Sequence, residues 1–125
     1  MRLRGIPVFL STCACAAVLL FSQNIMAAEP GAVTPEEGKA MILQKKDLVI
    51  LDVRNPGEYV AGHYPSSLNI PVNDLEERVS EVPANRPVLV LCAKGLRAQR
   101  GYDILQEKRK DIKELYILNG EPIFN

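Results

Sequence analysis

Three unbroken apolar runs limit the folds open to this chain of 125 residues. They occupy residues 48–51, 88–91 and 115–118, and segments with helical spacing lie between them. Runs of this kind are typical of strands that are buried on both faces. Strands that alternate with helices at this spacing indicate βαβ units. The pattern therefore predicts an α/β fold, in which helices cover both faces of a parallel sheet.

Weaker signals place the remaining elements. We expect short strands at residues 32–33 and 67–70, and a helical turn at 58–61. The sequence Thr34-Pro35-Glu36-Glu37 predicts a helix start, because Thr34 and Glu37 can form a capping box around a proline at the first helical position. A second helix is expected over 74–82, with its cap at Asn73 or Asp74.

The longest predicted helix runs from residue 97 to about residue 108. It directly follows the apolar run at 88–91 and a short loop that contains Gly95. Apolar residues at helical spacing predict the face that packs on the sheet. The residues expected on that face are Leu96, Tyr102, Ile104 and Leu105.

The first 28 residues have the features of a secretory signal peptide. Arg2 and Arg4 give a positive start, residues 6–21 are mostly apolar, and residues 27–28 are small enough for cleavage. The apolar stretch is short for a membrane span, which favours cleavage over an uncleaved anchor. Thr12 before Cys13 is a poor fit to a lipidation signal. We expect residues 1–28 to be cleaved and residues 29–125 to form one domain in the periplasm or outside the cell.

Cleavage would leave Cys92 as the only thiol, since Cys13 and Cys15 lie in the leader. A lone cysteine in an exported protein is either buried and inert or reactive. Loss of Arg2 and Arg4 changes the formal net charge from zero to −2. This charge does not suggest binding to nucleic acid or to an anionic membrane. A single histidine excludes a metal site built from several histidines. We expect a monomer that needs no metal and no cofactor.

Cys92 lies where a predicted strand ends and a predicted helix begins. Backbone N–H groups point into such a turn, and the helix dipole favours negative charge there. This position favours the reactive thiolate. Gly95 allows the backbone to curl closely, and the amides of residues 93–97 would form an anion-binding nest. Cys92 is the predicted nucleophile, and a buried, inert cysteine at a strand end is the alternative.

Five segments form a pattern that is specific as a set. They are Leu51-Asp52-Val53-Arg54, Glu58-Tyr59, Gly62-His63-Tyr64-Pro65, Leu68-Asn69-Ile70-Pro71 and Cys92-Ala93-Lys94-Gly95-Leu96-Arg97. In this order and spacing they resemble the rhodanese-like sulfurtransferases. The likeness extends from about residue 33 to residue 122. It implies a sheet of about five parallel strands, with the cysteine loop at the edge where the strands end.

The chain departs from the family pattern in two places. Ser66-Ser67 follows Pro65, where the family usually has Gly-Ala. Asn119-Gly120 precedes Glu121-Pro122, where the family usually has Gly-Gly and then an aromatic residue. Neither departure lies in the loop that carries the nucleophile.

The resemblance also implies roles for individual residues. The loop residues that would bind the substrate and the persulfide are Ala93, Lys94, Gly95, Leu96 and Arg97. Lys94 and Arg97 would attract an anionic donor, although Arg97 can instead serve the loop and Lys94 can simply be solvated. Asp52 and Arg54 are expected to pair and to hold neighbouring loops. His63 is expected to be a structural residue near a turn rather than a base.

The expected reaction is covalent sulfur transfer in two steps. The Cys92 thiolate would take the outer sulfur of a donor such as thiosulfate and pass it to cyanide or a thiol. Four residues separate Cys92 from Arg97, one fewer than in cysteine phosphatases and arsenate reductases, and a tighter ring suits a single sulfur anion. A module that only carries or senses sulfur is an alternative function. A phosphatase or arsenate reductase is the less favoured one.

Overall fold

The computed structural model describes residues 30–125, so the predicted leader and its two cysteines lie outside the described residues. Five strands in the described part form one parallel sheet with the order β1-β5-β4-β2-β3. The predicted α/β fold with a five-stranded parallel sheet is thus confirmed. The strands are β1 (Gly31–Val33), β2 (Val49–Asp52), β3 (Leu68–Asn69), β4 (Val88–Leu91) and β5 (Leu115–Leu118).

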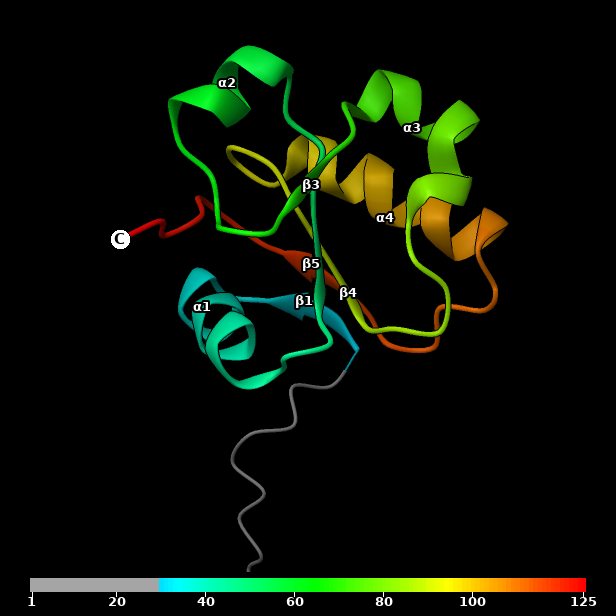
Figure 1. The fold of residues 1–125 in the computed structure, drawn as a ribbon, viewed down its shortest axis with the longest axis horizontal. Helices are drawn as coiled ribbons and strands as arrows, with labels where there is room; N and C mark the ends of the chain where they lie inside the picture. The colour runs from blue at the N-terminus through cyan, green and yellow to red at the C-terminus, as the bar shows by residue number, and fades with distance from the viewer. Residues whose placement is uncertain (1–29) are drawn as a thin grey trace, which may run out of the picture.

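Helices cover both faces of this sheet (Figure 1). On one face lies α1 (Pro35–Gln44), and on the other lie α3 (Val72–Arg78) and α4 (Leu96–Lys108). The short helix α2 (Pro56–Ala61) lies beyond the ends of the strands, near the loop that leads from β4 into α4. Among the helices of residues 30–125, none has the length and apolarity that a membrane span requires.

Alternate residues of the central strands point to opposite sides of the sheet. In β4, Val88 and Val90 join the core cluster under α3 and α4, whereas Leu89 and Leu91 join the cluster under α1. All four are fully buried, since both faces are covered. Each such side chain contributes roughly 1.5–3 kcal/mol through burial. This two-sided burial explains why the strands appear in the sequence as unbroken apolar runs.

The helices α1 and α2 both begin with a capping box. Thr34 and Glu37 form the predicted capping box at α1, with hydrogen bonds of 3.1 and 2.8 Å. Asn55 and Glu58 form a second one at α2, with hydrogen bonds of 2.9 and 3.3 Å. The reciprocal bonds satisfy backbone N–H groups that have no partner inside the helix. The carboxylate of Glu58 is thereby fixed close to the end of the sheet.

Two predictions about the helices need correction. The helix expected over residues 74–82 begins at Val72, because Pro71 rather than Asn73 or Asp74 occupies its N-cap. It ends at Arg78 and is followed by a 3₁₀ turn, Val79–Glu81.

The second correction concerns the packing face of α4. Leu96 does not pack on the sheet, since it is 85% exposed. The helix packs through Ala98, Gly101 and Leu105 instead. A Cβ at Gly101 would lie 3.2 Å from the side chains of Val53 and Val90, so the glycine allows the helix to approach the sheet closely.

The first departure from the family pattern is a tight turn with a strained residue. Tyr64 and Ser67 are joined by a backbone hydrogen bond of 3.2 Å, and Pro65 occupies the second position of the turn. Ser66, at the third position, has a φ of 65°. A type II turn requires positive φ at this position and therefore favours glycine there. A serine adopts this conformation only at an energetic cost.

The second departure is followed by a C-terminal tail that contacts the loop after α2. The backbone N–H of Ile123 donates to the hydroxyl of Tyr64 at 3.1 Å. The ring of Phe124 meets that of Tyr64 edge to face at 5.0 Å and lies 4.9 Å from the Arg54 guanidinium. An aromatic residue is thus present beyond Gly120, four positions further along the chain.

Candidate functional site

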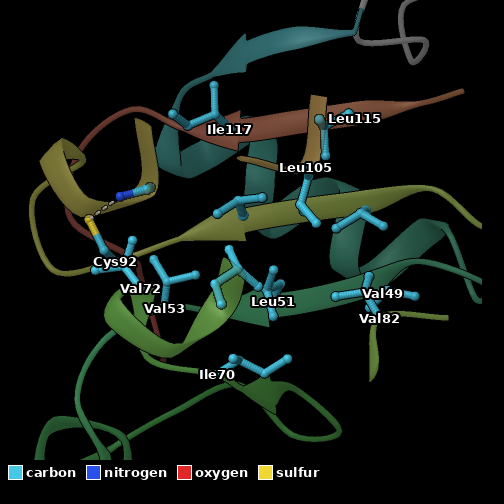
Figure 2. Close-up of a cluster of buried hydrophobic side chains, with 14 of the residues drawn as sticks. Val49, Leu51, Val53, Ile70, Val72, Val82, Cys92, Leu105, Leu115 and Ile117 are labelled. Atoms are coloured by element: carbon cyan, nitrogen blue, oxygen red, sulfur yellow. Dashed lines mark hydrogen bonds between the residues drawn. The ribbon is translucent and has the colours of Figure 1, made fainter. Parts of the chain in front are cut away.

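Cys92 belongs both to the hydrophobic core and to a surface cavity. It directly follows β4, is 1% exposed, and lies at one end of the core cluster beneath α3 and α4 (Figure 2). It also lines a cavity of about 380 Å³, together with Glu58, Ala93, Lys94, Leu96 and Arg97. The thiol is therefore covered by its own loop, yet it borders a space in which a small molecule can bind.

Two backbone amides point at the sulfur. The N–H of Gly95 donates to Cys92 Sγ at 3.0 Å, and the N–H of Ala98 donates at 3.2 Å. Gly95 is the N-cap residue of α4 and has no side chain to cap the helix. The N–H groups of the first helical turn lack partners within the helix, and Ala98 is the third residue of that turn. The sulfur therefore takes the place of a capping side chain, where the helix dipole favours a negative charge.

The predicted ring of amides is only partly present around the sulfur itself. Of residues 93–97, only Gly95 donates a hydrogen bond to Sγ, and the second donor, Ala98, lies just beyond that range. Ala98 is the third residue of α4, which begins at Leu96. The sequence prediction began this helix at residue 97 and so did not single Ala98 out. The side chains of Ala93, Lys94 and Leu96 line the cavity.

The conformation of Gly95 shapes this loop. Its φ of 101° lies in the left-handed region, which favours glycine. A Cβ at this position would lie 3.4 Å from the backbone nitrogen of Gly120 and 3.7 Å from Asn119 Oδ1. The loop is thus held against the turn that follows β5. The dihedral angle favours glycine here, whereas a Cβ would make only ordinary van der Waals contacts.

Arg97 is paired with Glu58 across the mouth of the cavity. Its Nη1 and Nη2 atoms donate to the two carboxylate oxygens at 2.6 and 2.9 Å. The hydrogen bonds from Arg97 lower the pKa of Glu58 to about 2, and the same pair raises the pKa of Arg97 above its ordinary value. Sequence reasoning did not identify Glu58 as a site residue. Its signal was the capping-box sequence that begins at Asn55.

Lys94 carries the remaining positive charge of the cavity. It is exposed, and within residues 30–125 its side chain forms no hydrogen bond or ion pair. Because Glu58 neutralises the charge of Arg97 and Lys94 is unpaired, a bound anion would be attracted mainly by Lys94.

Asp52 and Arg54 form the predicted pair, and it is buried. Arg54 Nε and Nη2 donate to the Asp52 carboxylate at distances of 2.6–3.1 Å. Nη2 also donates to the carbonyl of Gly62 at 2.7 Å, and Asn69 Nδ2 donates to the carbonyls of Asp52 and Arg54. Neither member of the pair lines the cavity. The pair joins the end of β2 to the loops on either side.

His63 lies outside the cavity. Its ring stacks on that of Tyr59 at a centroid distance of 3.8 Å, and its Nδ1 is 2.7 Å from the Tyr59 carbonyl oxygen. The side chain is exposed and does not line the cavity with Cys92. In the described part of the chain, no group of three or more potential ligands could hold a metal ion.

Comparison with known proteins identifies the family. A model described as "Rhodanese-like domain" matches residues 34–121, which is most of the chain. The chain therefore belongs to the rhodanese-like family. It is 30% identical over 104 residues to the "Uncharacterized protein YqhL" of Bacillus subtilis, an alignment that covers 83% of this chain and 75% of that protein.

Other relatives include named sulfurtransferases and solved structures. The chain is 29% identical over 79 residues to the "Thiosulfate sulfurtransferase GlpE" of Pseudoalteromonas translucida, covering 63% of this chain and 73% of that protein. It is also similar in fold to a rhodanese-like domain protein from Staphylococcus aureus, with a TM-score of 0.64 and 24% identity over 73% of this chain and 86% of the other. The chain is thus a rhodanese-like domain whose relatives include sulfurtransferases.

Proposed function

We propose that this protein is a sulfurtransferase that moves sulfane sulfur from a donor such as thiosulfate to cyanide or a thiol. One observation carries the proposal. Cys92 Sγ accepts hydrogen bonds from two backbone amides and lines a cavity at the start of a helix. A sulfur anion in this position is stabilised by fixed dipoles, which need no reorganisation during the reaction.

In the first step, the Cys92 thiolate attacks the outer sulfur of thiosulfate. A sulfur–sulfur bond forms to Cys92, the bond within the donor breaks, and sulfite leaves with the electron pair. The amides of Gly95 and Ala98 hold Sγ in place. Lys94, on the cavity wall, supplies positive potential to the departing anion.

In the second step, a thiol or cyanide attacks the outer sulfur of the Cys92 persulfide. The product leaves, and the thiolate is regenerated without a cofactor or an external oxidant. Division of the transfer into two steps through a covalent intermediate is the usual benefit of a protein nucleophile. His63 takes no part in this scheme, because it lies outside the cavity.

The short loop argues against a phosphatase or an arsenate reductase. Two amides already bind the sulfur, and four residues separate Cys92 from Arg97. A protein that releases phosphate from an aryl phosphate but takes no sulfur from thiosulfate would reverse this preference. A module that only carries sulfur would form the persulfide but show no steady-state turnover.

The decisive experiment is cyanolysis of the loaded protein. The reduced protein is incubated with thiosulfate, freed of excess donor, and treated with cyanide, and the thiocyanate released is measured. We expect about one equivalent from the wild type and none from Cys92→Ser. Mass spectrometry should show an adduct of about 32 Da that cyanide removes. Equal thiocyanate from both proteins would refute the proposal.

We further propose that the protein works as a monomer in the periplasm or outside the cell, after removal of residues 1–28. The residues that support export are the charged start and apolar stretch of the leader. The N-terminal peptide of the protein purified from its own host should begin at residue 29. A retained leader would contradict cleavage, and a dimer in light scattering would contradict the monomer.

A further inference from the structure

The charged side chains that line the Cys92 cavity differ in whether another side chain already pairs with them. Three charged side chains line it, namely Glu58, Lys94 and Arg97. Both outer nitrogens of Arg97 are bound to Glu58, whereas Lys94 has no partner within residues 30–125. The cavity therefore presents about one uncompensated positive charge. That is less than the two cations of the loop would suggest.

The compensation of Arg97 persists at every ordinary working pH. The pKa of Glu58 is about 2, because Arg97 and the backbone of Asn55 donate hydrogen bonds to its carboxylate. The neighbouring Asp52–Arg54 pair is also internally neutral and buried. It adds no net charge to the site. The guanidinium of Arg97 interacts electrostatically with Cys92, so the charge state of the Glu58–Arg97 pair affects a reaction at the sulfur.

The cavity wall also has an apolar side. Leu96 is 85% exposed, although it is the first residue of α4 and directly follows the sulfur-binding Gly95. Together with Ala93 it lines the same cavity as Cys92. An exposed leucine at the mouth of a reactive site provides a contact for an apolar group on a ligand. Thiosulfate carries no such group and has two negative charges.

We propose that Glu58 is a specificity-determining residue because it cancels the charge of Arg97. The site then favours sulfane-sulfur donors that carry at most one negative charge and have an apolar group beside the transferable sulfur. This inference rests on the proposed sulfur transfer through Cys92 and adds the class of donor. Glu58 lines the cavity but takes no part in bond making.

The same bonds form and break with either class of donor. The Cys92 sulfur binds the outer sulfur of the donor, the sulfur–sulfur bond of the donor breaks, and the electron pair leaves with the remainder. From thiosulfate the leaving group is sulfite, and from the methanethiosulfonate anion it is methanesulfinate. The two donors therefore share their transferable sulfur and differ mainly by one charge and one methyl group.

The test compares kcat/KM for thiosulfate and for the methanethiosulfonate anion, with cyanide as acceptor. In Glu58→Gln the ratio of thiosulfate to methanethiosulfonate should rise about fivefold, because the freed Arg97 favours the doubly charged donor by one additional charge interaction. Glu58→Asp keeps the charge and should keep the wild-type ratio. A ratio is unaffected by the fraction of protein that is folded.

A second variant tests the same charge balance by removing a positive charge instead of a negative one. Lys94→Gln removes an exposed cation whose side chain forms no hydrogen bond or ion pair within residues 30–125, so it should fold normally. Its ratio should fall about threefold. An unchanged ratio in Glu58→Gln or in Lys94→Gln, or an equal rise in Glu58→Asp, would overturn the inference. If the wild type transfers sulfur from neither donor, the proposed function itself fails.

Discussion

The backbone N–H of Ala98 donates a hydrogen bond to Cys92 Sγ at 3.2 Å, across six residues of the chain. The candidate nucleophile therefore also caps the helix on which the site is built. A thiolate at this position receives both a direct hydrogen bond and the favourable end of the helix dipole. The loop between the two residues must keep its conformation for either effect to operate.

Gly95→Ala should disturb that loop. The new Cβ would lie 3.4 Å from the backbone of Gly120 at a φ of 101°, and an L-residue pays about 1–2 kcal/mol for a left-handed conformation. We expect a loss of stability of this size in urea unfolding and at least a tenfold slower persulfide formation. Gly57→Ala is the matched control, because its Cβ would meet only Asn55 Oδ1 at 3.6 Å. Comparable losses in both variants would contradict this account.

Glu58→Gln should change the dependence of stability on pH. The pKa of Glu58 is lowered from 4.5 to about 2 in the folded state, so its ion pair stabilises the fold above about pH 4.5 and ceases to do so as the pH falls toward 2. Because the Glu58 side chain is 31% exposed, solvent screening limits the effect to about 1 kcal/mol at pH 7. Unfolding curves of the wild type and the variant should therefore converge near pH 2. A constant difference from pH 7 to pH 2 would exclude an electrostatic origin.

Asp52→Asn should be strongly destabilising. The Asp52 and Arg54 side chains are 1% and 8% exposed, and the substitution leaves the guanidinium buried without its counter-charge. Loss of one partner of such a pair costs about 3–5 kcal/mol. The matched control is Glu81→Gln, which breaks the exposed Arg78–Glu81 pair and should shift the unfolding midpoint only slightly. Similar shifts in thermal unfolding would show that burial of the Asp52–Arg54 pair does not matter.

Ser66→Gly should stabilise the protein. Ser66 adopts a φ of 65° in the turn after Tyr64, and glycine removes the cost of that conformation. Part of the gain is lost to the greater freedom of glycine in the unfolded chain, which leaves about 0.5–1 kcal/mol. Ser67→Gly is the opposite control, since the Ser67 hydroxyl donates to the Tyr64 carbonyl at 2.6 Å. Chemical denaturation should move the two midpoints in opposite directions.

The elements of this fold could be predicted where the signal is local. Both the apolar run at residues 88–91 and the capping box of Thr34 and Glu37 depend on neighbours in the sequence, and both predictions are confirmed. The position of Leu96 was predicted wrongly. Leu96 precedes Leu105 by nine residues, which at ~100° per residue places it on the opposite side of the helix, so the helical period itself excludes it from the packing face.

In the candidate site, too, features encoded by consecutive residues could be predicted, and contacts between distant residues could not. The Cys92 loop was recognisable because its residues are consecutive. The ion pair between Glu58 and Arg97 was not, because its members are 39 residues apart and meet only through the packing of α2 against the loop. The charge of a cavity depends on such long-range pairs. Motif residues alone therefore give a misleading count of the cations that a ligand meets.

The burial of Cys92 makes this thiol a probe of native-state opening. Because its sulfur is covered by the folded loop at 1% exposure, an alkylating reagent too large for the adjoining cavity can reach it only when the loop or the adjoining core opens. The alkylation rate, measured as denaturant is added, would separate local openings of the loop from global unfolding.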